Sequence, residues 1–350
     1  MNNRSLLIIL SFCLIQHSEA QETTSFKIIT VAFYNLENLF DYEDDPITFD
    51  DDRTPEGKDH WTETIYRAKI KNMAGVLAQI GAERAAAPPV IIGVCEIENR
   101  RVLEDLLNEE SLQEYEYGII HEDSPDRRGI DVALLYRKRL FTPTHSLAAE
   151  LVLHDRKDSS RRIYTRDQLV VSGMLDGERI HFIVCHWPSR SGGKAGSNYK
   201  RIKAAKLTRR LADSIFSLEP YASIITMGDF NDDPTDSSIK KVLNARNISE
   251  EIVPKSLYNP MYRIFKRGIG SLAWRDGWNL FDQLIISSEL LKNDYERYRF
   301  YRAGIYNRAF LQTPTGRYKG YPYRSFSNGT FTGGYSDHFP VYIYLIKRSN

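Results

Sequence analysis

The sequence has little cysteine, almost no excess charge of either sign, and no long apolar stretch after its first residues. Only 3 of its 350 residues are cysteine, which excludes a small protein held together by disulfides. Lys and Arg number 47 against 46 Asp and Glu, so the formal net charge is +1 and bulk charge alone cannot bind nucleic acid. Hydrophobic residues make up 42% and charged residues 27%, which is typical of globular proteins and excludes disordered or collagenous chains.

The first twenty residues have the pattern of a signal peptide. One early positive charge, Arg4, precedes a short apolar run over 6–15, and residues 18–20 (SEA) end it with the small residues that signal peptidase requires. The run is about half of the ~20 residues that a membrane-spanning helix needs, and it lacks the amphipathic period of a buried helix. We therefore predict a signal peptide over 1–20, no transmembrane segment, and export to the periplasm or the external medium.

Removal of that peptide leaves two cysteines, Cys95 and Cys185, near the ends of the apolar runs VIIGVC and HFIVC. An oxidising compartment permits a disulfide, but a sequence does not show whether two Cα atoms lie within bonding range. We favour two buried free thiols, and no neighbouring base suggests a cysteine nucleophile.

Two segments have the apolar period of a helix, over 62–80 and 199–218, and a shorter helix is expected over 101–107. The predicted buried stripe of the second consists of Leu207, Leu211, Ile215 and Leu218. Apolar, β-branched runs predict strands over 27–34, 90–95, 117–120, 130–136, 168–175, 180–185, 223–227, 281–287 and 339–346. Strands outnumber helices, and hairpin-like pairs alternate with helical crossovers, so we predict a layered α/β fold in one domain over 21–350.

Polar residues recur at or beside the ends of these strands. A single Asp after a strand is usually a turn or cap residue, but a whole set delivered by strand ends is typical of a site on a rigid sheet. The set consists of Asn35, Glu96, His186, Asp229, Asn231, Asp282, Asp337 and His338.

Seven short motifs surround these residues. They are YNLENLFD (34–41), VCEIEN (94–99), RRGIDVALLY (127–136), CHWPSR (185–190), GDFND (228–232), FDQLIIS (281–287) and YSDHFPV (335–341). In this order the chain resembles the endonuclease/exonuclease/phosphatase superfamily, and HWPSR and YNLENLFD resemble its secreted bacterial members. The resemblance implies a four-layer α/β sandwich, with two central mixed β-sheets flanked by helices, and Mg²⁺-assisted attack of water on a phosphate ester.

The resemblance also implies a metal set. Glu96 would be the principal metal carboxylate, Asn35 would orient it or a metal-bound water, and Asp337 would assist at the metal. Mg²⁺ prefers hard oxygen ligands and keeps several waters, so one or two carboxylates suffice, and Mn²⁺ is a possible substitute.

By the same resemblance, Asp229 would orient or deprotonate the attacking water, and Asn231 would hold a phosphate oxygen. His338 would bind or protonate the phosphate, oriented by Asp282. A carboxylate beside His338 favours the charged imidazolium, which suits contact with an anion.

The resemblance also implies roles in substrate binding for two further residues. His186 stands where the family places a second phosphate-contacting or acidic group, and Arg166, in TRDQL, matches an arginine that contacts the phosphate in some members. No rival chemistry competes well, because the chain has no Gly-x-Ser-x-Gly motif and no Cys/His cluster spaced for zinc.

We predict a secreted Mg²⁺-dependent phosphoesterase, a monomer without a stable protein partner, that acts as a nuclease on DNA or RNA. The alternative within the same fold is a phosphomonoesterase, or a sphingomyelinase-like phosphodiesterase, acting on a phosphorylated sugar, inositol or lipid headgroup. The region WRDGWNLFDQ (274–283) lacks the Trp-Cys-Asp-Arg signature of inositol 5-phosphatases. A third possibility, a catalytically silent binding module, conflicts with the intact set of polar residues.

Three charged stretches keep two interpretations each. Residues 190–210 carry eight Lys and Arg and no acid. This stretch is either a patch that steers a polyanion toward the protein or a solvated face of a helix. Residues 317–331 mix basic and aromatic residues. These side chains either bind a substrate, by stacking on bases or contacting a headgroup, or pack against the rest of the protein. The acidic stretch 41–52 does not match a helix–loop–helix calcium loop, so we favour a solvated loop over a Ca²⁺ site.

Overall fold

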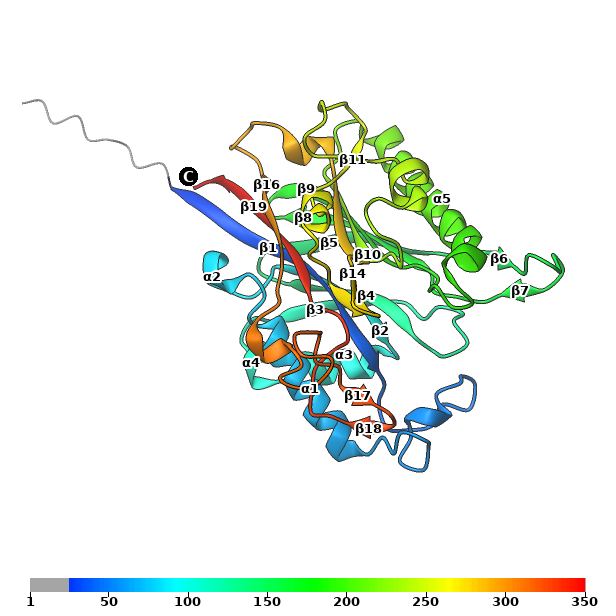
Figure 1. Cartoon of the computed structure of the whole chain (residues 1–350). Coiled ribbons are helices and arrows are strands. Elements are labelled where there is room, and N and C mark those ends of the chain that lie inside the picture. The colour runs from blue at the N-terminus through cyan, green and yellow to red at the C-terminus, as the bar shows by residue number, and fades with distance from the viewer. Residues whose placement is uncertain (1–24, 350) are drawn as a thin grey trace, which may run out of the picture.

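The computed structural model describes residues 25–349, and the predicted signal peptide over 1–20 lies outside the described residues. Two large β-sheets form the centre of the molecule (Figure 1). Within residues 25–349, no helix is both long and apolar enough to cross a membrane.

The first sheet has six strands in the order β16-β19-β1-β2-β4-β3. Its strands are β1 (Phe26–Leu39), β2 (Ile91–Ile97), β3 (Tyr117–His121), β4 (Asp131–Arg137), β16 (Arg299–Ile305) and β19 (Val341–Arg348). Strand β1 pairs in parallel with β2 and antiparallel with β19, so the sheet is mixed.

The second sheet has seven strands in the order β11-β12-β15-β10-β9-β8-β5. Its strands are β5 (Phe141–Ala149), β8 (Gln168–Leu175), β9 (Glu178–His186), β10 (Ile224–Asp229), β11 (Ala245–Asn247), β12 (Leu257–Asn259) and β15 (Asp282–Ser287). Three short pairs lie outside the sheets: β6 (Leu153–His154) with β7 (Arg162–Ile163), β13 (Leu272–Trp274) with β14 (Gly277–Asn279), and β17 (Phe326–Ser327) with β18 (Thr330–Phe331).

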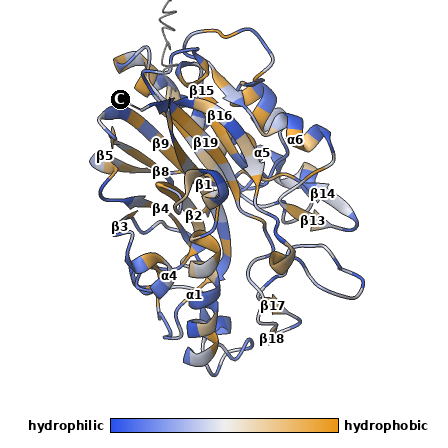
Figure 2. Cartoon of the chain, turned by 90° about the vertical axis from the view of Figure 1, so that its left-hand side faces the viewer, coloured by the Kyte–Doolittle hydropathy of each residue, from blue (hydrophilic) through white to orange (hydrophobic). Residues whose placement is uncertain are grey.

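Helices cover the outer face of each sheet. The helices are α1 (Glu63–Leu77), α2 (Ala82–Ala85), α3 (Arg100–Leu107), α4 (Glu110–Gln113), α5 (Lys194–Leu218) and α6 (Tyr262–Lys266), with short turns at Asp51–Arg53, Ser238–Val242, Ser288–Leu291 and Ala309–Leu311. Helix α5 lies on the opposite side of the strands from α1, α3 and α4 (Figure 1). Figure 2 shows the same arrangement from a second direction, with apolar residues frequent along the central strands.

Strand β1 illustrates why the runs are continuously apolar. Val31 and Phe33 belong to the core between the two sheets, whereas Ala32 and Tyr34 pack in the core beneath α1 and α3. A third core lies between the second sheet and α5. Because each central strand is buried on both faces, its sequence shows no alternation of polar and apolar residues. The predicted four-layer sandwich is therefore confirmed.

The predicted elements differ from the structure in several places, and the short strands β11 and β12 are among the elements that were not predicted. Helix α5 begins at Lys194 instead of residue 199, and Leu218, predicted to be buried, is 81% exposed, because Ala204, Thr208 and Phe216 form the buried face instead. Strands β5 and β16 were not predicted, because as edge strands they keep exposed and polar residues. Cys95 and Cys185 are buried free thiols, as expected.

Candidate active site

Three neighbouring strands of the second sheet end together and bring three predicted residues side by side. Asp229 of β10 pairs in register with His186 of β9 on one side and with Asp282 of β15 on the other. All three residues are buried. The register of the sheet therefore fixes a row of two carboxylates and an imidazole at one edge.

Two strands of the first sheet supply the facing residues through an irregularity. The pairing of β1 with β2 is regular as far as Asn35 and Cys95, then shifts before it resumes at Leu39 and Ile97. Glu96, within the shift, has a φ of 59°, a conformation that non-glycine residues rarely adopt. A bulge of this kind re-aims a side chain, so Glu96 turns toward the ends of the second sheet.

Asn35 joins the two sheets. Its Nδ2 lies 3.2 Å from Oε1 of Glu96 and 3.2 Å from Oδ2 of Asp229, and its Oδ1 accepts a hydrogen bond from the Glu37 N–H at 2.9 Å. The hydroxyl of Ser336 donates to the Asn35 carbonyl at 2.7 Å. Asn35 is therefore held from both sides and orients the two carboxylates. We call Asn35, Glu96, His186, Asp229, Asp282 and His338 the polar edge.

His338 and Asp282 form a buried pair in the polar edge. The His338 Nδ1 lies 2.6 Å from Oδ2 of Asp282, and its Nε2 lies 4.0 Å from Oδ2 of Asp229. Burial disfavours the charged ring, but the adjacent Asp282 carboxylate outweighs burial and raises the pKa of His338 well above its usual value. His338 is therefore a cation whose Nε2 faces the centre of the edge.

Asp229 is a carboxylate whose proton affinity is unusually high. Burial and the nearby Asp282 carboxylate raise its pKa to about 7, although His338 and a hydrogen bond from the Asn231 N–H oppose the rise. Such a group exchanges a proton near neutral pH, which is the property expected of a general base.

His186 stays neutral beside two carboxylates. Its Nε2 lies 3.7 Å from Oε1 of Glu96 and 3.8 Å from Oδ2 of Asp229. Burial, Arg166 and Arg128 lower the pKa of His186 well below its usual value, so the imidazole keeps a free lone pair.

Glu96, His186 and Asp229 together could hold a divalent metal. One ligand atom from each lies within 4.8 Å of the others. Two carboxylates and a neutral imidazole are a suitable donor set, and a cation there would offset the negative charge that raises the pKa of Asp229. The residues present therefore fit a metal, with His186 in a position that the sequence had assigned to substrate.

Three other predicted residues lie near the edge and already have hydrogen-bond partners, although the buried Nε of Arg166 has none. Arg166 is buried and donates to Asp126 at 3.0 Å and to the Trp187 carbonyl at 2.8 Å. Asn231, with a φ of 52°, donates through Nδ2 to the same carbonyl at 2.9 Å. Asp337 is partly exposed and accepts from Arg324 at 2.9 Å, outside the metal-competent group.

Sequence reasoning missed a buried charged cluster behind Asn35. Glu37, with a φ of 48°, accepts hydrogen bonds from the backbone and hydroxyl of Ser325, and from Arg324 at 3.2 Å. Lys69 is fully buried and donates to the Glu37 carbonyl and to the Ser325 hydroxyl. The signal was present in YNLENLFD, where an acidic residue follows Asn35 within an otherwise buried strand. The cluster fixes part of the aromatic, basic stretch 317–331 to β1.

A second missed group supports the loop after Asp229. Asp232 is fully buried and pairs with Arg201 at 2.8 Å and with Arg190 at 3.3 Å. Two members of the basic stretch 190–210 therefore point inward to carboxylates rather than toward solvent.

This arrangement matches a known family. Residues 30–347 match the sequence model of the Endonuclease/Exonuclease/phosphatase family. The chain belongs to that family. It is thus a phosphoesterase of a divalent-metal-dependent family, and the Glu96–His186–Asp229 group is where its fold could hold the metal.

Solved structures share the family fold at low identity. A humanized TDP2 from D. rerio has a TM-score of 0.54 at 12% identity, over 91% of this chain and 99% of that chain. An endonuclease/exonuclease/phosphatase family protein from Bacteroides thetaiotaomicron gives 0.53 at 17% identity, over 92% and 98%. A mannosyl-6-phosphatase from the same organism gives 0.51 at 18%, over 91% and 99%. No match was found among curated proteins.

Proposed function

We propose that this phosphoesterase is an exported, Mg²⁺-dependent phosphodiesterase that hydrolyses nucleic acid. The observation that carries the proposal is the convergence of a metal-competent group, Glu96–His186–Asp229, and a charged His338–Asp282 pair at one buried edge. The signal-peptide pattern of residues 1–20 supports export.

The residues divide the work of hydrolysis among them. Asp229 orients the attacking water and accepts its proton, and Asn35 holds the Asp229 carboxylate in place. The charged His338 binds a phosphate oxygen or protonates the leaving oxygen, and Asp282 keeps its ring oriented. A divalent metal, when bound, supplies the remaining charge neutralisation at the phosphate. Mn²⁺ should replace Mg²⁺ readily, because both ions prefer carboxylate and water oxygens as ligands.

The charge inventory favours a diester over a monoester. A phosphomonoester dianion carries one more negative charge than a diester and needs a further cation at the edge. The nearby arginines are bound to acids: Arg166 and Arg128 share Asp126, Arg190 binds Asp232, and Arg324 binds Asp337. Among these arginines of the described edge, only the Arg128–Arg166 pair carries a charge that no separate acid matches, so few cations remain for a dianion.

The test is hydrolysis of plasmid and single-stranded DNA with Mg²⁺, beside phosphomonoesters that include mannose 6-phosphate. EDTA and the Asp229→Ala protein serve as controls. Cleavage of DNA that both controls abolish is the expected result. Phosphate release from the monoesters with intact DNA would contradict the proposal and assign the chain to the phosphatases of the family.

A further inference from the structure

Six of the seven cations of helix α5 fall into two sets, and the seventh, Lys200, lies over the ring of Tyr199. The ion pairs that α5 forms within residues 25–349 involve Lys194, Arg201 and Arg209. Lys203, Lys206 and Arg210 are exposed on the helix and have no carboxylate partner among those residues. The first set builds structure, whereas the second remains available for an anion.

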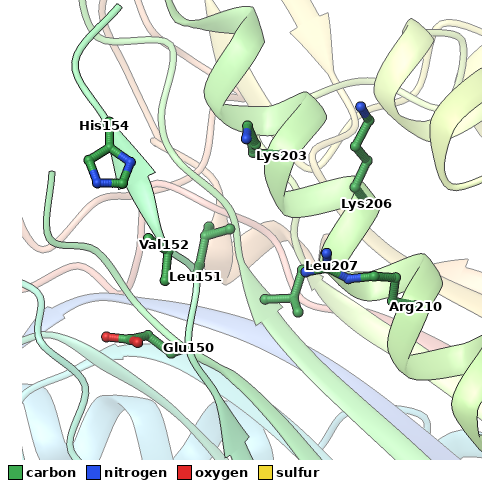
Figure 3. Close-up of a pocket in the computed structure, with 8 residues that line it drawn as sticks. All are labelled: Glu150, Leu151, Val152, His154, Lys203, Lys206, Leu207 and Arg210. Atoms are coloured by element: carbon green, nitrogen blue, oxygen red, sulfur yellow. The ribbon is translucent and has the colours of Figure 1, made fainter. Parts of the chain in front are cut away.

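These three cations line one wall of a groove. The opposite wall is the segment that leads into β6, with Leu151, Val152 and His154 facing the helix (Figure 3). We call Leu151, Val152, His154, Lys203, Lys206 and Arg210 the basic groove. It encloses about 320 Å³ and continues into a neighbouring hollow of about 420 Å³ that shares Lys203 and Lys206 and adds Arg156.

The one acid of the groove is already neutralised. Glu150 lines it, but its carboxylate is paired with Arg162 of β7. The groove therefore presents several free positive charges and no free negative one, although the chain as a whole is almost neutral. Local concentration of one sign in a concave surface raises the local concentration of a ligand of the opposite sign.

The groove begins close to the polar edge. Arg201, two residues before Lys203, pairs with Asp232 in the loop after Asp229 and donates to the Ser189 carbonyl in the loop after His186. The seven residues from Lys203 to Arg210 rise about 10 Å along the helix. A chain of phosphates that leaves the polar edge along α5 therefore meets these cations in succession.

The apolar floor of the groove indicates which class of polyanion the groove would bind. Leu151 and Leu207 form the buried base of the groove, and Val152 is 46% exposed within it. Unpaired bases have apolar faces that can cover such a floor, whereas a duplex encloses its bases and a sulfated polysaccharide has none. The groove thus suits a ligand with regularly spaced anions and apolar faces.

We propose that the basic groove binds the sugar-phosphate backbone and bases of a single nucleic-acid strand beside the polar edge. The inference rests on the proposed function and adds the form of the substrate, a single strand. Lys203, Lys206 and Arg210 contact successive phosphates, and the exposed Val152 contacts bases.

The test measures binding separately from cleavage. A labelled DNA single strand of about 20 nucleotides, longer than most single-strand sites, is titrated with the Asp229→Asn protein in Mg²⁺ at several salt concentrations. The test variant is Lys203→Glu/Lys206→Glu/Arg210→Glu. The matched control is Arg263→Glu/Lys266→Glu/Arg267→Glu, which reverses three exposed cations at α6. Both variants keep active Asp229 in a second preparation, assayed on bis(p-nitrophenyl) phosphate.

The groove variant should lose about tenfold or more in affinity, and its slope of log K against log salt should fall by about 2, since each phosphate contact contributes about 0.7. The control should change the slope far less, and both should hydrolyse bis(p-nitrophenyl) phosphate at the wild-type rate. If the charge reversal unfolds α5, the same triple change to Gln should still lower the slope.

Other outcomes overturn the inference. Equal loss of affinity in the groove and control variants would show that binding depends only on the overall charge of the protein. Unchanged affinity in the groove variant would show that the groove does not bind the strand. Tighter groove-dependent binding of duplex DNA or heparin would exclude a single strand as the ligand. Failure of the proposed function is distinguishable, because groove-dependent binding without any DNA cleavage would refute nuclease activity alone. If the groove variant cleaves DNA as fast as the wild-type protein, only the role of the groove would be refuted.

Discussion

The polar edge and the basic groove are both rich in charge, but they hold their charges in opposite ways. At the polar edge, Asn35 lies within hydrogen-bond distance of both Glu96 and Asp229, and His338 lies within ion-pair distance of Asp229. Asp229 and His338 are buried, and Glu96 is partly buried. In the groove, Lys203 and Lys206 are exposed and unpaired within the described chain. Buried, mutually fixed charges act at set positions and shift one another's pKa, whereas exposed charges act over distance and are screened by salt.

The comparison predicts that the largest effects of substitution fall at the polar edge. Glu96→Ala should lower hydrolysis of bis(p-nitrophenyl) phosphate by roughly a thousandfold or more, because it removes a carboxylate from the metal-competent group. Glu104→Ala, an exposed carboxylate on α3, is the control and should leave activity unchanged. Full activity of a folded Glu96→Ala protein would remove Glu96 from the reaction.

His338 should affect turnover rather than binding. His338→Ala should lower kcat by about 10²–10³ with little change in KM, since its charged ring acts on the transition state. Asp282→Asn should reproduce most of that loss, and the double variant should add little, because Asp282 acts through His338. His145→Ala, an exposed histidine, is the control. An effect confined to KM would make His338 a ground-state binding group instead.

The buried cluster behind the edge should control stability. Lys69→Met removes a buried cation that donates to the Glu37 carbonyl and to the Ser325 hydroxyl. It should lower the free energy of unfolding by about 3 kcal/mol, because it leaves those two acceptors without their donor and leaves Arg324 as the remaining cation beside the buried Glu37 carboxylate. Lys71→Met, on the exposed face of the same helix, should change it little. Urea unfolding of both proteins checks this, and equal stability would show that the cluster is solvated.

The smallest effect is expected at Asp176, a partly exposed carboxylate that is paired with two lysines. Burial raises the pKa of Asp176, but hydrogen bonds from Lys27, Lys347 and Tyr298 outweigh it and lower the pKa to about 2. Its stabilising contribution is therefore present above about pH 4 and lost as the pH falls toward 2. Asp176→Asn should lower stability at pH 6 by about 1 kcal/mol, after allowance for solvent screening, and by almost nothing near pH 2. Thermal unfolding across that range tests it, and a deficit independent of pH would contradict the assignment.

The polar edge could be predicted from the sequence because the ends of the strands can be recognised where an apolar run meets a polar residue. Asn35 and Asp229 end an apolar run and Asp282 begins one, and a sheet brings such ends to one edge. The turn of Glu96 was not predictable, since VIIGVCEI gives no sign of the bulge that redirects its side chain. The resemblance assigned His186 to a phosphate-contacting position, and its proximity to Glu96, which the sequence did not reveal, depends on that bulge.

Long-range pairing was the other feature that the sequence concealed. Glu37 and Ser325 are 288 positions apart and meet only through the folded chain. The basic stretch 190–210 likewise looked uniform, but the structure turns Arg201 inward and leaves Lys203 outward. A helical period assigns charged residues to faces only when the buried face is known. Of the predicted stripe, Leu207 is buried and Leu211 and Ile215 pack against the core, whereas the prediction for Leu218 was wrong.

The most direct test of the polar edge is calorimetric titration of the wild-type and Glu96→Ala proteins with Mn²⁺, with Mg²⁺ as competitor. Wild-type protein should bind the ion in a site from which Mg²⁺ displaces it, and Glu96→Ala should lose that binding while remaining folded. Unchanged Mn²⁺ binding in Glu96→Ala would contradict the account, because the buried carboxylates of the edge would then not be the metal site.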